Sequence, residues 1–498
     1  MDSKNSINNS ALLTDLYQLT MAQGFFENNN DGLNACFHLF FRDYPFKGGY
    51  AISCGQAQIV DFVNNYSFTK DDIKYLKSLK FGGDSHLSKE FIEHLSHLKL
   101  SVNIDAVPEG SVVFPNEPVL RITGPIFECQ LLETALLNIF NFQTLIATKA
   151  SRICQAAQCD VAEFGLRRAQ GPCGGIYASR AACIGGCSST SNVCAGSVFS
   201  LPVSGTHSHS WVQSFDCELE SFRAYSRVFP DNCVLLVDTY DINQGIKNAI
   251  TVGLEMKARG QHLTAIRIDS GDLSWLSKIA RKELDHAGLN DTGIILSNDL
   301  DEYSIKSIKS EGACFTGLGV GTKLTTGYDQ PTLGGVFKLG AINNMSHNKM
   351  DVHWTPKIKV SESLGKITIP GVLGVRRYFD KNNKLSGDMI YDINDGVDKS
   401  SIIVDPNDGL RRKHLNPYCQ NSKTKSYIDL LEPIIVNGQA RDVDYSWEAA
   451  KRRAIDGLSQ LDETQKRILN PHTYPVGLEY SLFNKRRAMI SNIKGISD

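Results

Sequence analysis

Apolar runs and amphipathic segments alternate along the middle of the chain. Four largely hydrophobic stretches predict buried strands, at residues 198–203, 233–237, 263–268 and 293–296. Between them, apolar positions recur at helical spacing and predict helices over residues 243–259 and 273–286. Apolar strands separated by helices are typical of a parallel sheet that is covered by helices. The pattern predicts an α/β domain, and a barrel-like one fits it well.

The flanking regions have different patterns. The N-terminal part predicts a helix that starts near Thr14 and Asp15, a hairpin over residues 35–55, helices over 62–100, short strands over 102–123 and a long helix over 131–152. Beyond residue 343, short strands and turns precede a helix-rich segment at residues 441–469. We expect its buried face to include Trp447, Ala450 and Ile455.

These patterns divide the chain of 498 residues into three regions. Residues 1–130 are expected to form an N-terminal α+β domain, which parts of residues 345–435 rejoin. Residues 131–344 are expected to form an irregular (α/β) barrel. Residues 345–498 are expected to form a C-terminal extension that is rich in helix at its end.

Composition narrows the class of protein. Apolar residues make up 42% and charged residues 21%, which is ordinary for a globular protein, and the formal net charge is −2. Such a charge does not favour binding to nucleic acid or to a membrane surface. The polar stretch Met1 to Ser10 lacks an apolar signal core, so we expect a cytoplasmic protein. An odd total of 13 cysteines then favours free thiols over a disulfide framework, and the spacing does not favour a zinc site.

Polar residues follow the predicted strands, at the edge of a parallel sheet where functional groups gather. Asp238 and Asp241 offer two carboxylates three positions apart, and Arg267 with Asp269 offers a cation and a carboxylate on one side of a strand. Further candidates for substrate binding are Ser297, Asn298, Gly319, Gly321 and Thr322. The glycine-rich segment GLGVGTK at residues 317–323 ends in the hydroxyl of Thr322 and the amine of Lys323. Its backbone amides are suited to binding a phosphate.

Two motifs lie between residues 159 and 211. The segment EFGLRRAQGP at residues 163–172 places Arg167 and Arg168 beside glycines and Phe164, which suits anions and flat rings. The segment VSGTHSHSW at residues 203–211 places His209 among small hydroxyl residues. Together these motifs resemble the F/M-G-L-R-R-A-Q-G and G-T-x-A-H-S segments of the nicotinate phosphoribosyltransferase family. Asp238 and Asp241 are not adjacent, which departs from the acidic pair of type I phosphoribosyltransferases and favours the type II family.

The resemblance implies an enzyme of NAD biosynthesis. Such an enzyme transfers a phosphoribosyl group from phosphoribosyl pyrophosphate to nicotinate, giving nicotinate mononucleotide and diphosphate, with Mg²⁺ and with ATP as co-substrate. In the family, a histidine at the position of His209 is transiently phosphorylated by ATP. The segment LLTDLYQ at residues 12–18 is similar to an N-terminal signature whose Asp and Tyr reach a neighbouring subunit's site. A homodimer with shared sites, through Asp15 and Tyr17, is therefore implied.

The resemblance also assigns roles to single residues. Phe164 is similar in position to an aromatic that packs on the nicotinate ring opposite Tyr17 of the neighbour. Arg267 is our first choice for the nicotinate carboxylate, and Arg167, the second choice for it, is assigned to the diphosphate. His209, Arg267 and Asp269 are the expected catalytic residues; the expected substrate-binding residues also include Thr206 and Asn192, where a neutral amide favours nicotinate over nicotinamide.

Some alternatives remain open. A sister enzyme that uses nicotinamide, and a catalytically silent binding or sensor protein on the same scaffold, are consistent with much of the pattern. His207 and His209 form a His-x-His pair that also suits a metal, although a third ligand is not evident and the Mg²⁺ ligands cannot be assigned. Ser208 replaces the usual Ala of the family. Leu373 stands where the family often has a lysine, which puts a phosphate role for that loop in doubt.

Overall fold

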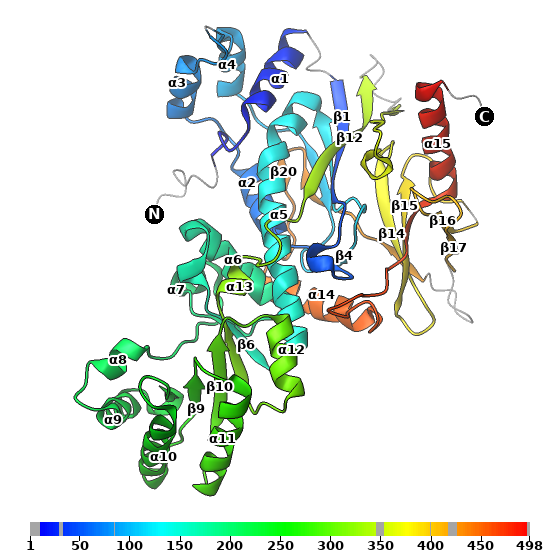
Figure 1. Ribbon diagram of the computed structural model, residues 1–498. Coiled ribbons are helices and arrows are strands. Elements are labelled where there is room, and N and C mark those ends of the chain that lie inside the picture. The colour runs from blue at the N-terminus through cyan, green and yellow to red at the C-terminus, as the bar shows by residue number, and fades with distance from the viewer. Residues whose placement is uncertain are drawn as a thin grey trace. The chain divides into compact units, whose positions relative to one another are not determined.

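The computed structural model describes residues 10–28, 33–83, 85–344, 353–398, 400–416 and 426–495. The chain forms two compact units: unit 1 comprises Met1–Leu145 and Thr332–Asp498, and unit 2 comprises Ile146–Pro331. One limit falls inside helix α5 (Ile126–Ala157), so this helix contributes to both units (Figure 1). The sequence placed the limits near residues 130 and 344 instead. The polar stretch at residues 1–9 lies outside the described residues.

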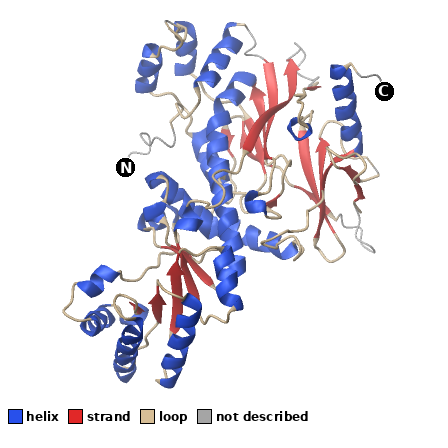
Figure 2. Ribbon diagram, in the orientation of Figure 1, coloured by secondary structure: helices blue, strands red, loops and turns tan. Residues whose placement is uncertain are grey.

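Unit 2 is built on a six-stranded sheet in which every pairing is parallel. Figure 2 shows its strands flanked by helices. The α/β class predicted from the sequence is therefore confirmed. The order across the sheet is β7 (Ser189–Thr190), β6 (Asp160–Glu163), β11 (Gly317–Val320), β10 (Gly293–Asn298), β9 (Ala265–Ile268) and β8 (Val234–Leu236).

The helices of unit 2 follow their strands closely. The best predicted is α11 (Leu273–His286), whose bounds match the expected segment. The Asp272 side chain accepts a hydrogen bond from the Trp275 amide at its N-terminus, and Leu276, Ala280 and Leu284 line its buried face. The others are α6 (Gly171–Gly185), α7 (Val193–Phe199), α8 (His209–Gln213), α9 (Glu218–Val228), α10 (Ile242–Ala258), α12 (Glu302–Ser310) and α13 (Thr322–Thr325).

An irregular segment takes the place of the strand expected at residues 198–203. That prediction was wrong, because α7 continues to Phe199 and only Val203 makes a β-bridge, to Thr190. Further along, Nε2 of His207 accepts a hydrogen bond from the Leu236 amide of β8 at 3.1 Å. The segment from Val203 to His207 therefore contacts both outer strands of the sheet, which makes the domain an irregular barrel.

Unit 1 contains two larger sheets, in which the spatial order of the strands differs from their order in the sequence, and one short two-stranded ribbon. A seven-stranded sheet has the order β13 (Thr355–Pro356), β12 (Gly335–Asn344), β1 (Leu33–Phe41), β5 (Leu120–Pro125), β3 (Asn103–Ala106), β19 (Glu432–Val436) and β20 (Gln439–Ala440). A six-stranded sheet has the order β17 (Arg412–His414), β16 (Ile402–Val404), β21 (Val476–Glu479), β15 (Leu385–Asp392), β14 (Leu373–Phe379) and β18 (Tyr427–Asp429). The ribbon pairs β2 (Ala51–Ile52) with β4 (Val112–Val113).

The hairpin expected over residues 35–55 was wrong. Strand β1 pairs with β5 and β12, whereas β2 pairs with β4, so the two strands lie in different sheets. The other helices described in unit 1 are α1 (Leu16–Glu27), α2 (Gln56–Asn64), α3 (Lys70–Ser78), α4 (Lys89–Ser96), α14 (Trp447–Gln460) and α15 (Tyr480–Lys494). On α14, Ala450 is buried as predicted, but Ile455 is exposed.

Among the described residues, no helix has the length and apolar character needed to cross a bilayer.

Candidate functional site

A cavity of about 360 Å³ opens in unit 2 at the carboxyl ends of its strands. It brings together Phe164, Arg167, Thr206, His209, Arg267 and Asp269, all named from the sequence as site residues. The remaining lining residues include His207, which the sequence suggested as a metal ligand, and Ser208, which departs from the family pattern. The sequence did not single out the others, which are Leu166, Ser191, Gly205 and Leu236. Six of the site residues that were predicted from the sequence therefore lie together in one cavity.

Arg267 is the centre of the polar network in this cavity. Its Nε donates to Ser297 Oγ at 2.8 Å, its Nη1 to Thr206 Oγ1 at 2.9 Å and its Nη2 to Asp269 Oδ1 at 2.8 Å. The guanidinium carbon lies 5.6 Å from the centre of the Phe164 ring. These contacts hold the arginine fork in one orientation, with an aromatic face beside it.

Asp269 connects Arg267 to His209. Its Oδ1 accepts hydrogen bonds from both Arg267 and Ser297 Oγ, and its Oδ2 lies 3.9 Å from Nε2 of His209. Nδ1 of His209 forms a hydrogen bond of 3.2 Å with Thr239 Oγ1. The imidazole is thereby oriented through one nitrogen, and its other nitrogen faces the carboxylate.

Asp238 follows β8 and supports the turn after β9. Its Oδ2 accepts hydrogen bonds from the Asp269 amide at 3.0 Å and from Ser270 Oγ at 2.6 Å. Its Oδ1 is buried and has no hydrogen-bond partner among the described residues. A buried carboxylate oxygen without a partner is costly, so this atom is suited to a ligand hydroxyl or a cation.

Gly319 and Gly321 lie beneath Phe164 and do not line the cavity. A Cβ on Gly319 would lie 2.6 Å from the Phe164 ring, and a Cβ on Gly321 would lie 3.2 Å from the Phe164 carbonyl oxygen. Strand β11 thus provides a flat surface on which the aromatic ring rests. Thr322 begins α13. The glycines allow the close packing of Phe164, and their expected role in binding phosphate stays a prediction.

Arg167 lies on the cavity wall and is exposed to solvent. The turn that carries it is fixed from below by Glu163, a buried residue at the end of β6. The Glu163 carboxylate accepts hydrogen bonds from the Gly165 amide, from Ser179 Oγ at 2.8 Å and from Thr190 Oγ1 at 2.6 Å. Sequence reasoning missed this residue, although a carboxylate that ends a buried strand was a usable signal.

Asn192 is fully buried and is not among the lining residues. Its Oδ1 caps α7 by accepting the Ala195 amide, and its Nδ2 donates to the Gly175 carbonyl at 3.2 Å and to Ser179 Oγ at 3.1 Å. The side chain therefore has a structural role in joining α6 to α7. The direct choice between nicotinate and nicotinamide that was expected of it has no support from this placement.

His207 also has a structural role. Its Nε2 accepts the Leu236 amide, which leaves the proton on Nδ1, 3.4 Å from the Ser208 carbonyl oxygen. Burial lowers the pKa of His207 to about 4, so the ring is neutral at physiological pH. With Nε2 occupied, the suggested His-x-His metal pair loses one of its ligands. Among the described residues, no group of three or more His, Cys, Asp or Glu side chains is arranged to hold a metal.

The remaining predicted residues lie in unit 1 or outside the cavity lining. Asp15 caps α1 together with Gln18, and its Oδ2 accepts a hydrogen bond from Thr134 Oγ1 at 2.6 Å. Tyr17 projects from the same helix, and its side chain is about half exposed. Ser297 contacts Arg267 and Asp269 from below, and Asn298 is exposed at the end of β10. The cysteines in the described part of the chain are thiols rather than disulfides.

This arrangement defines a class of protein: an α/β enzyme with an oriented arginine, two carboxylates and a histidine at the carboxyl edge of a parallel sheet. Three models of nicotinate phosphoribosyltransferase match the chain, the N-terminal domain at residues 12–141, the family model at residues 159–394 and the C-terminal domain at residues 374–486. The chain belongs to the nicotinate phosphoribosyltransferase family.

Individual relatives agree with this membership. The chain is 40% identical over 491 residues to nicotinate phosphoribosyltransferase of Bacillus subtilis, which covers 97% of this chain and 96% of that protein. It is 31% identical over 531 residues to the Homo sapiens protein of the same name, with 95% of each chain covered. The crystal structure of human nicotinic acid phosphoribosyltransferase matches with a TM-score of 0.81 at 28% identity, covering 96% of this chain and 99% of that chain.

Proposed function

We propose that this protein transfers the phosphoribosyl group of phosphoribosyl pyrophosphate to nicotinate, with coupling to ATP. The products are nicotinate mononucleotide and diphosphate, so the reaction supplies NAD biosynthesis. The observation that carries the proposal is the contact of Arg267 with Asp269 and Phe164 in a single cavity. Family membership and the names of the relatives support the same reaction.

Arg267 and Phe164 fit a flat aromatic acid. Arg267 donates three of its five N–H bonds to Ser297, Thr206 and Asp269, which leaves two for a substrate carboxylate. The Phe164 ring offers an apolar face to the pyridine. Nicotinamide carries no charge and would leave the arginine without a carboxylate, so this acceptor is not favoured. A silent binding protein is not favoured either, because the proposed reactive groups are all present.

Asp269 and Asp238 are assigned to the ribosyl group. The anomeric carbon gains positive charge as its bond to diphosphate breaks and the pyridine nitrogen attacks, and fixed carboxylates nearby stabilise that charge. The free Oδ1 of Asp238 is suited to a ribose hydroxyl or to Mg²⁺. Bound Mg²⁺ would offset the charge of the leaving diphosphate. Arg167, exposed on the cavity wall, is assigned to the diphosphate oxygens.

His209 is assigned to ATP coupling. Its Nε2 attacks the terminal phosphorus of ATP, ADP leaves, and water later releases the phosphate from the imidazole. When Nδ1–H donates to Thr239 Oγ1, the lone pair of the ring is on Nε2, which is then the reactive nitrogen, and the side chain is 42% exposed, so a nucleotide can reach it. Phosphorylation places negative charge next to the site of the ribosyl cation.

The proposal includes a homodimer in the cytoplasm. Asp15 and Tyr17 lie on unit 1, and the half-exposed Tyr17 ring is available to stack on the pyridine in a second copy's site. Sedimentation at several protein concentrations would test the dimer.

The reaction is tested with purified protein, nicotinate, phosphoribosyl pyrophosphate and Mg²⁺, with and without ATP. Formation of nicotinate mononucleotide, increased by ATP and accompanied by ADP, is the expected result. No mononucleotide under either condition would reject the proposed function. Mononucleotide formation without ADP release would retain the transfer and reject the coupling.

A further inference from the structure

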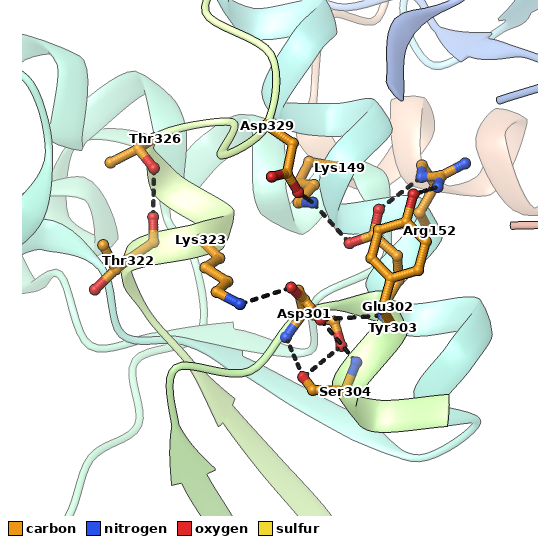
Figure 3. A network of polar contacts seen from close by, with 10 residues as sticks. All are labelled: Lys149, Arg152, Asp301, Glu302, Tyr303, Ser304, Thr322, Lys323, Thr326 and Asp329. Atoms are coloured by element: carbon orange, nitrogen blue, oxygen red, sulfur yellow. Dashed lines mark hydrogen bonds and ion pairs between the residues drawn. The ribbon is translucent and has the colours of Figure 1, made fainter. Parts of the chain in front are cut away.

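A charged network lies at the N-terminus of α12, outside the cavity lining (Figure 3). One part joins Asp301 to Lys323, whose Oδ2 and Nζ are 2.7 Å apart. The other part surrounds Glu302, which is fully buried and pairs with Lys149 at 2.7 Å and with Arg152 at 2.8 Å. The reaction proposed above does not use these groups, so their arrangement needs another explanation.

Asp301 has two tasks at once. Its Oδ1 caps α12 by accepting the amides of Tyr303 at 3.1 Å and Ser304 at 2.7 Å, while its Oδ2 holds Lys323. The Asp301 side chain is 8% exposed and that of Lys323 24% exposed. Burial opposes ionisation of both groups, yet the hydrogen bond and charge attraction between them, together with the hydrogen bonds from Ser304 to Asp301, outweigh it and lower the pKa of Asp301 while raising that of Lys323. The pair is therefore charged in the folded protein.

The connection from β10 to Asp301 is short and strained. Ser297, at the end of β10, contacts both Arg267 and Asp269. Asn298 follows with a φ of 135°, a conformation that residues other than glycine rarely adopt. Such a backbone persists only when its surroundings hold it, and three residues further on the Asp301–Lys323 pair provides an anchor.

The other end of the pair leads back to Phe164. Lys323 lies in α13, two residues after Gly321. Gly321 and Gly319 are in close contact with Phe164, and the Phe164 amide donates to the Val320 carbonyl at 2.8 Å. The ion pair thus connects the loop that supports Arg267 with the loop that supports the aromatic ring.

Resting on the proposed function, we infer that the Asp301–Lys323 ion pair is a positioning device for the acceptor acid. It holds the ends of β10 and β11 together, so that Ser297 orients Arg267 while β11 supports Phe164. Glu302, with Lys149 and Arg152, fixes the start of α12 as the base of this device. Asp301 and Lys323 act through Arg267 and Phe164 and do not contact the acceptor themselves.

Two substitutions break the pair in different ways. Asp301→Asn keeps an oxygen that caps α12 and removes the charge that Lys323 needs. Lys323→Met removes the cation and keeps the apolar stem. Each is expected to raise the KM for nicotinate by about tenfold, with kcat changed less than about threefold. The double variant should be no worse than either single one, because both remove one interaction.

Two controls accompany these variants. Lys323→Arg keeps the charge and should stay within about twofold of the wild-type KM. Arg223→Met removes ion pairs to Glu220 and Glu255 on α9 and α10, which include no residue of the charged network. The nicotinate KM of this control should not change. If the KM for nicotinate rose as much in Arg223→Met as in the two test variants, the effect would be due to general destabilisation, and the inference would be overturned.

The outcomes separate this inference from the proposed function. Hydrogen exchange of the amides at residues 298–301 should become faster in both single variants, whatever the protein catalyses. If the wild type forms no nicotinate mononucleotide, the proposed function is rejected. Hydrogen exchange at residues 298–301 still tests whether the Asp301–Lys323 ion pair holds this segment in place. An unchanged KM in an active enzyme, additive effects in the double variant, or unchanged exchange would each reject the positioning role.

Discussion

Arg267 and Asp269 are two residues apart at the end of β9 and pair directly, with 2.8 Å between Nη2 and Oδ1. The other oxygen of Asp269 lies 3.9 Å from Nε2 of His209. One carboxylate therefore lies between the cation assigned to the acceptor and the histidine assigned to ATP. This geometry gives a physical reason why binding of the acid and phosphorylation of the histidine should influence each other.

Replacing Arg267 by lysine is expected to weaken nicotinate binding. Lysine keeps a positive charge beside Asp269 but lacks the fork that binds a carboxylate through two N–H groups. Loss of one charge-assisted contact costs roughly 1.5–3 kcal/mol, or about ten- to a hundredfold in affinity. Steady-state kinetics should show this in the KM for nicotinate, with a much smaller change in thermal stability. An unchanged KM would assign the carboxylate to a different residue.

Replacing His209 by alanine should abolish ATP coupling and leave the fold intact. The side chain is 42% exposed and is not part of the core, so little packing is lost. Incubation with γ-labelled ATP should place acid-labile phosphate on the wild type and none on the variant. The circular dichroism spectrum should be unchanged. Equal labelling of the two proteins would remove His209 from its assigned role.

Replacing Gly319 by alanine should displace Phe164. The added Cβ would lie 2.6 Å from the ring, and overpacking of this kind costs roughly 1–3 kcal/mol. We expect a lower melting temperature and a higher KM for nicotinate. Gly317→Ala on the same strand is a matched control, since its nearest contact would be an ordinary 3.6 Å. Equal effects of the two substitutions would contradict the support of Phe164 by β11.

Acid should weaken the fold through His207. Its pKa in the folded protein, about 4, lies below the ordinary value of 6.5 for a histidine, because burial disfavours the charged ring. As pH falls between these values the unfolded state takes up the proton first, so stability present above pH 6.5 is lost as pH falls toward about 4, by at most about 3 kcal/mol.

Chemical denaturation at several pH values tests this expectation. His207→Gln should show a shallower loss of stability below about pH 6.5 than the wild type. His97→Gln serves as a control, because the His97 side chain is 76% exposed. If His207→Gln lost stability as steeply as the wild type, the burial of a neutral imidazole would be contradicted.

Much of unit 2 could be predicted because its signals are local. The helix from Leu273 to His286 has a capping aspartate and a regular apolar face, and both act within a few residues. The strand end that carries Arg267 and Asp269 was visible because a buried apolar run stops there. A strand was wrongly predicted at residues 198–203 because a short apolar run is compatible with either a helix or a strand. In the structure, Val198 is exposed on the last turn of α7.

Other features depend on contacts between distant parts of the chain. The aromatic alternation of β1 suggests a strand, but its partners β5 and β12 are far away in the sequence, so the hairpin could not be ruled out locally. Asn192 was expected to distinguish nicotinate from nicotinamide, whereas Ser179 and Gly175 determine where its amide points. The support of Phe164 by Gly319 is likewise visible only when β6 and β11 are paired.

The central claim is that the cavity selects an acid through the arginine fork of Arg267. The most direct test is a competition in which equal concentrations of nicotinate and nicotinamide are offered together with phosphoribosyl pyrophosphate, ATP and Mg²⁺. Separation of the two mononucleotides should show a large excess of nicotinate mononucleotide, which shrinks in Arg267→Lys. Equal products, or an excess of nicotinamide mononucleotide from the wild type, would contradict the account.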